Sequence, residues 1–126
     1  MTGAQVLVVE DNEKNMKLVR DILQATGYSP LEASSGEQAL ALAAEHAPAL
    51  VLMDIQLPDL DGAEALQRLR SDERTAGIPV LALTAQAMQG DRERFLAAGF
   101  DGYLSKPVDV DELIETVRRY CDGGTE

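Results

Sequence analysis

The sequence predicts an α/β fold in which one doubly wound, five-stranded parallel sheet carries helices on both faces. Three apolar runs of four residues show no alternation with polar residues, which is typical of strands buried on both faces. Segments with helical periodicity separate the candidate strands, and this alternation implies right-handed crossovers between parallel strands. The 126 residues suffice for one domain with a substantial core.

Five segments are the candidate strands. The clearest are the apolar runs at residues 6–9, 50–53 and 80–83. Residues 28–33 and 102–105 are weaker candidates, because polar residues and glycine interrupt their apolar character. In chain order these segments give five strands, each followed by a stretch long enough for a helix.

Apolar residues spaced three and four apart predict a helix after each strand. The supporting sets are Met16, Val19, Ile22 and Leu23; Ala39, Leu40 and Ala43; Ala63, Leu66 and Leu69; Met88, Phe95, Leu96 and Ala98; and Val110, Leu113, Ile114, Val117 and Cys121. Glycine and proline mark the ends of these elements, at Gly27, Pro48, Gly77, Pro79 and Gly99.

The whole chain, residues 1–126, is predicted to be one domain, with a core of about residues 5–121 and a loose tail at 122–126. No apolar run approaches the roughly 20 residues of a membrane span, and residues 1–5 do not resemble a signal peptide. A lone Cys121 cannot form an internal disulfide, and its apolar position favours a packed side chain. We therefore expect a cytoplasmic protein that does not enter the membrane.

Acidic residues outnumber basic ones, with 22 Asp and Glu against 11 Lys and Arg and a net charge of −11. Such a domain is poorly suited to binding phosphate backbones, so no direct nucleic-acid partner is expected. The acidity serves solubility unless some of the carboxylates converge on one site.

Polar side chains follow four of the five predicted strands. Glu10 and Asp11 come directly after the first strand, Asp54 after the third, Thr84 after the fourth and Lys106 after the fifth. Because the carboxyl ends of parallel strands meet at one edge of the sheet, these residues are expected to converge.

Three carboxylates in one crevice repel one another unless a hard cation lies among them, and Mg²⁺ prefers such oxygen ligands. A carboxylate can then attack a phosphoryl group and form an acyl phosphate, while a lysine ammonium and a threonine hydroxyl bind the phosphoryl oxygens. Taken singly, Asp11 and Thr84 could be helix caps and Lys106 a solvated side chain. Their joint placement at the correct strand ends favours the chemical interpretation.

At these positions the sequence resembles the receiver domains of bacterial two-component response regulators. The resemblance covers the chain from about Gln5 to Cys121, and it is closest to single-domain regulators of the DivK type and to receiver modules of hybrid histidine kinases. The motifs that carry it are residues 8–12 (VVEDN), 52–58 (LMDIQLP), 81–85 (LALTA) and 103–107 (YLSKP), with 88–93 and 98–99 typical of those subgroups. The resemblance implies a flavodoxin-like (βα)5 domain with strand order 2-1-3-4-5.

The resemblance also implies a role for each acidic residue of the site. Asp54 is expected to be the phosphoacceptor. Asp11 is expected to bind Mg²⁺, or alternatively Mn²⁺, directly, with Glu10 acting through water. Asp54 itself and the backbone carbonyl of Gln56 complete the expected metal ligands. Receiver domains have either Asp or Glu at the position of Glu10. The choice of Glu affects only the expected arrangement of water around the metal ion.

Three further roles follow from the same resemblance. Thr84 is the expected switch hydroxyl that moves to bond the phosphoryl group, and Lys106 is the ammonium that pairs with that group. Tyr103 matches the aromatic switch position and is expected to turn inward when Thr84 moves. The Lys106–Pro107 bond is a candidate cis peptide that would aim the lysine.

The resemblance implies a component of a phosphorelay rather than an enzyme with a separate substrate. The domain is expected to take its phosphoryl group from a histidine kinase or a histidine phosphotransfer protein, with intrinsic self-phosphorylation and autodephosphorylation. Its target would bind the face formed by the fourth helix, fifth strand and fifth helix. A monomer or weak dimer is expected.

Three other chemistries fit the sequence less well. Haloacid dehalogenase-like phosphatases need a second Asp two residues after the nucleophile, where this chain has Gln56, and Asp59 and Asp61 do not directly follow a strand. A calcium loop fails because its first ligand position is Leu57. No phosphate-binding glycine loop is present. These other chemistries are therefore disfavoured.

The context of the domain allows three interpretations. Met1 close to the first strand and a short tail after Cys121 favour a single-domain regulator. The chain could instead be a receiver module from a hybrid kinase or a multidomain regulator. A receiver fold used for interaction without phosphorylation is the third interpretation, and the complete set of chemical residues argues against it.

Two glutamines carry a smaller hypothesis. Gln56 lies two residues after Asp54, and Gln86 lies two after Thr84. A carboxamide at either position could orient a water that attacks the acyl phosphate, as glutamine does in small GTPases. The alternative is that both are solvated loop residues, in which case changing each to Ala leaves the dephosphorylation rate unchanged.

Residues 91–94 are interpreted as a solvated helix face, and His46 as a surface residue.

Overall fold

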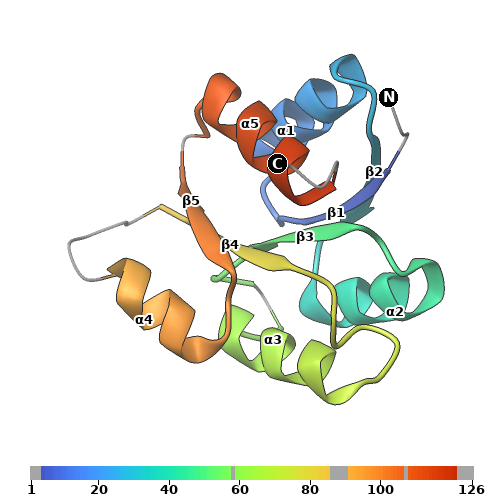
Figure 1. Ribbon diagram of the computed structural model, residues 1–126, viewed down its shortest axis with the longest axis vertical. Coiled ribbons are helices and arrows are strands. Elements are labelled where there is room, and N and C mark those ends of the chain that lie inside the picture. Colours follow the sequence, from blue (N-terminus) through green and yellow to red (C-terminus); the bar gives the residue numbers. More distant parts are fainter. Residues whose placement is uncertain (1–3, 58, 86–90, 107, 122–126) are drawn as a thin grey trace.

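A computed structural model describes residues 4–57, 59–85, 91–106 and 108–121 of the chain. Within these residues five strands alternate with five helices (Figure 1). The strands are β1 (Gln5–Val9), β2 (Ser29–Ala33), β3 (Leu50–Asp54), β4 (Val80–Thr84) and β5 (Gly102–Ser105). The helices are α1 (Glu13–Ala25), α2 (Gly36–His46), α3 (Gly62–Ser71), α4 (Asp91–Ala98) and α5 (Val110–Cys121). The Lys106–Pro107 bond, Gln86, Met88 and the tail at 122–126 lie outside the described residues.

The five strands form a single parallel sheet in the order β2-β1-β3-β4-β5. This confirms the predicted fold class and strand order. The order reverses between β1 and β3: the chain first adds β2 on one side of β1, and then adds β3, β4 and β5 on the other. Ligands of such sheets bind at this reversal, beyond the carboxyl ends of the strands.

The burial of each strand explains why the five strand signals differed in strength. β3 and β4 are buried at every residue, and β1 at every residue but its first. These are the three continuous apolar runs, with helices over both faces. β2 and β5 lie at the edges of the sheet and are only partly buried, which accounts for their mixed sequences.

Helices cover both faces of the sheet in unequal numbers (Figure 1). α1 and α5 lie on one face, and α2, α3 and α4 lie on the other. Alternate residues of each strand contribute to two separate apolar cores. In β1, Val6 and Val8 pack with α1 and α5, whereas Leu7 and Val9 pack with the other three helices. Cys121 is packed against the first of these cores, as its sequence position predicted.

Short polar side chains fix the start of three helices. Asn12 accepts hydrogen bonds from the backbone N–H groups of Lys14 and Asn15 at the start of α1. Ser35 and Asp61 play the same part for α2 and α3. No helix among the described residues is both long enough and apolar enough to span a membrane.

Candidate functional site

Three carboxylates meet where the strand order reverses. Glu10 and Asp11 directly follow β1, and Asp54 is the last residue of β3, the strand paired with β1. One carboxylate oxygen from each of the three lies within 4.8 Å of the others. The predicted convergence of these residues is therefore present in the structure.

Backbone N–H groups hold two of these carboxylates in place. The Asn12 N–H donates to Glu10 Oε2 at 3.1 Å, and the Gln56 N–H donates to Asp54 Oδ1 at 2.9 Å. Glu10 and Asp54 are buried, whereas Asp11 is exposed. Since Asn12 is the residue that caps α1, the cap interpretation of Asp11 is wrong, and its carboxylate remains at the mouth of the site.

Lys106 brings a positive charge to this group from the end of β5. Its Nζ lies 3.0 Å from Asp54 Oδ2, to which it donates a hydrogen bond, and 2.8 Å from Glu10 Oε1, with which it forms an ion pair. The Lys106 backbone N–H donates to the Thr84 carbonyl at 2.8 Å, which fixes the lysine relative to β4. The lysine side chain is only 15% exposed, so solvent screens these contacts weakly.

The titration of the site reflects competition between burial and charge. Burial raises the pKa of Glu10 above its ordinary value by more than the contacts with Lys106 and the Asn12 N–H lower it, and the charge of Asp54 raises it further. Burial alone would lower the pKa of Lys106, but its contacts with Glu10 and Asp54 outweigh burial and raise the pKa. The negative charge of the buried Glu10 carboxylate is thus only partly compensated by its contacts.

The donor set fits a hard divalent cation. Glu10 Oε1 is buried and makes no hydrogen bond to the described residues, so its only close partner there is the Lys106 ion pair. The Lys106 ammonium carries one positive charge and is shared with Asp54, so one of these two buried negative charges lacks compensation. The three converging carboxylates offer the oxygen ligands that Mg²⁺ takes, and the exposed Asp11 leaves the site open to solvent for the waters that Mg²⁺ retains.

A cavity of about 230 Å³ opens beside Asp54. Its lining consists of Asp54, Ile55, Gln56, Thr84, Ala85, Arg94 and Lys106. Since one water occupies roughly 30 Å³ of the liquid, this space is large enough for a small tetrahedral anion with some of its water. Thr84 is buried at the end of β4, and Gln56 faces the same space from the segment after β3.

Tyr103 lies apart from this cavity. Its half-buried ring packs against Phe95 of α4, with the ring centroids 5.6 Å apart. Phe95 also meets Phe100 edge-on at 6.0 Å. Tyr103 therefore connects α4 with β5 instead of contacting Asp54, and it also borders a hollow of about 290 Å³ between β5 and α5.

Arg94 is the site residue that the sequence did not indicate. Residues 91–94 had the polar composition of a solvated helix face, yet Arg94 lines the cavity together with Asp54 and Lys106. Its guanidinium carbon also lies 5.4 Å from the centre of the Phe95 ring. No local motif marks this position, because only the packing of α4 against the sheet brings it to the cavity.

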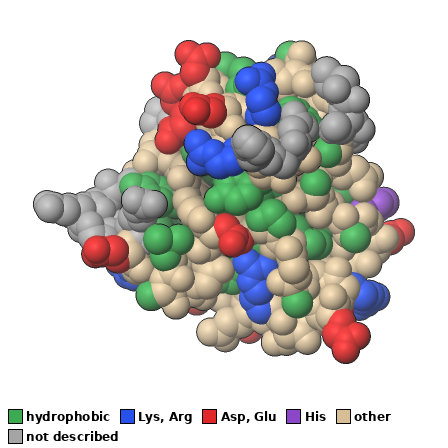
Figure 2. Space-filling view, viewed as in Figure 1, with side chains coloured by type: hydrophobic (Ala, Val, Ile, Leu, Met, Phe, Trp, Pro, Cys, Tyr) green, Lys and Arg blue, Asp and Glu red, His purple; other side chains and the backbone are tan. Residues whose placement is uncertain are grey.

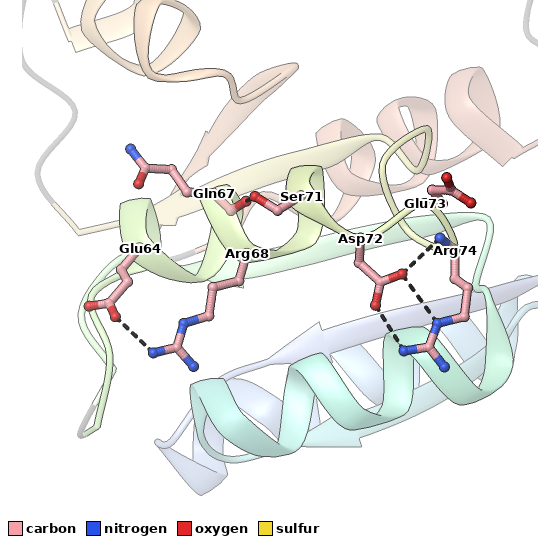
Figure 3. A pocket seen from close by; sticks show the side chains of 7 residues that line it. All are labelled: Glu64, Gln67, Arg68, Ser71, Asp72, Glu73 and Arg74. Atoms are coloured by element: carbon pink, nitrogen blue, oxygen red, sulfur yellow. Dashed lines mark hydrogen bonds and ion pairs between the residues drawn. The ribbon is translucent and has the colours of Figure 1, made fainter.

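A larger hollow, of about 870 Å³, lies along the exposed side of α3 (Figure 3). The labelled side chains are mostly charged and already paired with one another: Arg68 donates to Glu64, and Arg74 donates to Asp72. None of these residues is buried. These charges largely neutralise one another at an open surface, so the cavity beside Asp54 is the better candidate for the functional site.

Comparisons with known proteins identify the family of the chain. The family model described as "Response regulator receiver domain" matches residues 6–118. The polar-differentiation response regulator DivK of Brucella ovis is 51% identical over 115 residues, which cover 91% of this chain and 94% of that protein.

Two solved structures are similar over nearly the whole chain. The receiver domain of the sensor histidine kinase PA1611 from Pseudomonas aeruginosa, with a magnesium ion coordinated in its active-site cleft, has a TM-score of 0.87 and 38% identity, and the match covers 96% of this chain and 99% of that one. The receiver domain of Ssk1 from Saccharomyces cerevisiae, crystallised with the histidine phosphotransfer protein Ypd1, has a TM-score of 0.86 and 31% identity, covering 94% and 89%. The chain therefore belongs to the response regulator receiver domain family.

Proposed function

We propose that this domain takes a phosphoryl group onto Asp54 and thereby changes a protein-binding face. The observation that carries the proposal is the position of Asp54, buried at the sheet reversal, 3.0 Å from the Lys106 ammonium and beside a cavity that also contains Thr84. A carboxylate, an ammonium and a hydroxyl around one space are the groups that phosphoryl transfer to a carboxylate requires.

The transfer is a displacement at phosphorus. An Asp54 oxygen attacks a phosphohistidine, an O–P bond forms, and the P–N bond breaks with its electron pair left on the imidazole. Lys106 and the Thr84 hydroxyl bind the phosphoryl oxygens as their negative charge moves into the cavity. Hydrolysis of the acyl phosphate by water returns Asp54 to its free state, with Gln56 placed at the cavity to affect that rate.

Glu10, Asp11, Asp54 and the backbone carbonyl of Gln56 would hold Mg²⁺, with Mn²⁺ as a substitute of similar ligand preference. When bound, the cation neutralises the carboxylates and withdraws charge from the phosphoryl oxygens. The buried Glu10 carboxylate supports this assignment, because among the described residues it shares its one ammonium partner, Lys106, with Asp54. The receiver domain of PA1611, with its magnesium ion, supports it by similarity.

The upstream partner in this proposal is a histidine kinase or a histidine phosphotransfer protein. The complex of Ypd1 with the Ssk1 receiver domain supports this class of partner by similarity. The domain itself supplies the groups that catalyse its own phosphorylation and dephosphorylation, acts in the cytoplasm as a monomer or weak dimer, and binds no nucleic acid directly, in keeping with its charge of −11.

The downstream partner would bind the face formed by α4, β5 and α5. Tyr103 lies on this face and packs against Phe95 of α4, so movement of Thr84 toward the phosphoryl group would allow Tyr103 to turn inward. Acidic side chains gather over α5 (Figure 2), where Asp111, Glu112 and Glu115 are all exposed. A target with a basic contact surface matches this charge.

Intact mass after incubation with Mg²⁺ and acetyl phosphate tests the proposal. We expect one phosphoryl adduct on the wild type, no adduct on Asp54→Asn, and none on the wild type in EDTA. The Asp72→Asn variant, at a half-exposed carboxylate that pairs with Arg74, is the matched control and should form the adduct normally. An adduct that persists on Asp54→Asn, or no adduct on any sample, would contradict the proposed function.

A further inference from the structure

Arg94 lines the cavity at Asp54 from helix α4. None of the residues proposed for phosphoryl transfer or metal binding belongs to this helix. Those residues either end a strand or come within two residues of its end, whereas Arg94 lies in α4. Helical side chains lean toward the N-terminus of their helix. The Arg94 side chain is therefore expected to extend toward the N-terminal end of α4, and it lines the cavity together with Thr84 and Ala85.

The charges around Asp54 leave room for one more cation. An acyl phosphate on Asp54 would carry about two negative charges, and Glu10 and Asp11 add one each. A divalent cation and Lys106 together supply three positive charges. Among the described residues that line the cavity, the remaining cationic side chain is Arg94. Its guanidinium would therefore bring the phosphorylated site close to neutrality.

The position of the Arg94 side chain on the Phe95 ring also favours binding of a phosphoryl group. Its guanidinium carbon lies 5.4 Å from the centre of the Phe95 ring, and Phe95 is buried and packed edge-on against Phe100. A ring face attracts a guanidinium and limits its motion. A planar guanidinium presents paired N–H donors that match two oxygens of a phosphoryl group, which a lysine cannot do.

We propose that Arg94 is a phosphoryl-binding residue, which donates from α4 to the phosphoryl group on Asp54. This inference rests on the proposed function, since it requires an anion at Asp54. The contact would pull α4 toward the phosphorylated site. Phe95 of α4 packs against both Phe100 and Tyr103. A displacement of α4 would therefore change the contact between Phe95 and Tyr103 of β5.

Binding of beryllofluoride, an unreactive analogue of the phosphoryl group, tests this inference. Calorimetric titrations on the full chain would measure beryllofluoride affinity at saturating Mg²⁺ and, separately, Mg²⁺ affinity without the anion. The variants are Arg94→Gln, which removes the charge, and Arg94→Lys, which keeps the charge but loses the paired donors. Arg74→Gln is the matched control, because Arg74 is exposed and pairs with Asp72 away from the cavity.

We expect Arg94→Gln to weaken beryllofluoride binding about tenfold, the size of one charged hydrogen bond at a partly exposed site, with Arg94→Lys between it and the wild type. Mg²⁺ affinity without the anion should stay within about twofold or rise slightly, because a nearby positive charge has been removed. Arg74→Gln should match the wild type in both titrations.

Two results would overturn the assignment. Beryllofluoride affinity of Arg94→Gln within twofold of the wild type would show that Arg94 does not contact the anion. Equal weakening of Mg²⁺ and beryllofluoride binding, with a lower unfolding midpoint, would mean that Arg94 only packs over Phe95. If instead the wild type binds no beryllofluoride, the proposed function itself fails.

Discussion

At the scale of single residues, Lys106 compensates two buried carboxylates with one ammonium. Glu10 and Asp54 are 2% and 6% exposed in their side chains, and both lie within 3.0 Å of Lys106 Nζ. Burial nevertheless leaves the pKa of Glu10 raised. Ionisation of Glu10 therefore costs more in the folded state than in the unfolded chain, and a divalent cation at the proposed metal site would offset that cost.

The pH dependence of stability follows from this raised pKa. The folded state holds the Glu10 proton more tightly than the unfolded chain, so the free energy of unfolding falls as pH rises from about 4.5 through the raised pKa. Glu10→Gln removes this dependence and should be more stable than the wild type at pH 7 by an amount on the order of 1 kcal/mol. Urea denaturation in EDTA from about pH 5 to 8 measures the difference.

The difference in stability between Glu10→Gln and the wild type isolates the contribution of the Glu10 carboxyl group, because carboxylates elsewhere in the chain titrate alike in the variant and the wild type. The Asp72 pKa, for example, is lowered by Arg74, and its stabilising effect is lost only as pH falls. Saturating Mg²⁺ should reverse the order at pH 7, since the metal favours the ionised Glu10. A stability difference that does not grow with pH, or a less stable variant in EDTA, would show that Glu10 is fully compensated.

At the scale of elements, the turn between β3 and α3 determines where Asp54 and Gln56 lie. Gly62, the first residue of α3, donates its N–H to the Ile55 carbonyl at 3.1 Å. A Cβ on Gly62 would stand 2.7 Å from the Ile55 Cα and 3.3 Å from the Asp54 carbonyl oxygen. Backbone atoms cannot yield as a flexible side chain can, so any side chain here displaces the segment that carries the phosphoacceptor.

Gly62→Ala should therefore lower the free energy of unfolding by about 2 kcal/mol and weaken Mg²⁺ binding. Gly77→Ala is the matched control, because its Cβ would meet nothing within 4 Å and its φ is not positive. That control should stay within about 0.5 kcal/mol of the wild type. Urea denaturation and Mg²⁺ titration give both quantities. Equal behaviour of the two variants would mean that the β3–α3 turn does not constrain the site.

At the scale of the whole molecule, the sequence predicted the fold because its strand signals follow burial. β1, β3 and β4 lie inside the sheet, and their continuous apolar runs could be identified directly. The edge strands β2 and β5 gave weaker signals, because each is only partly buried and pairs with a single strand among the described residues. The convergence of Glu10, Asp11, Asp54 and Lys106 could be predicted from topology, since parallel strands bring their carboxyl ends together.

Contacts between distant elements could not be predicted in this way. Asp59 accepts hydrogen bonds from the backbone N–H groups of Gly36 and Glu37 and so caps α2 from the β3–α3 segment. Arg70 donates to the carbonyl groups of Ala76, Ile78 and Gly99, and to Asp101. Such contacts depend on the exact packing of elements, which leaves no periodic signal in the sequence. The position of Arg94 beside the cavity could not be predicted for the same reason.

The identity of the phosphoacceptor is the central claim, and three carboxylates lie close enough to compete for it. Borohydride reduces an acyl phosphate to an alcohol, so treating the acetyl phosphate-modified protein with borohydride and mapping its peptides by mass spectrometry marks the carboxylate that was modified. We predict reduction of Asp54 to homoserine and of no other residue. Reduction at Glu10 or Asp11, or reduction spread over exposed carboxylates, would contradict the account.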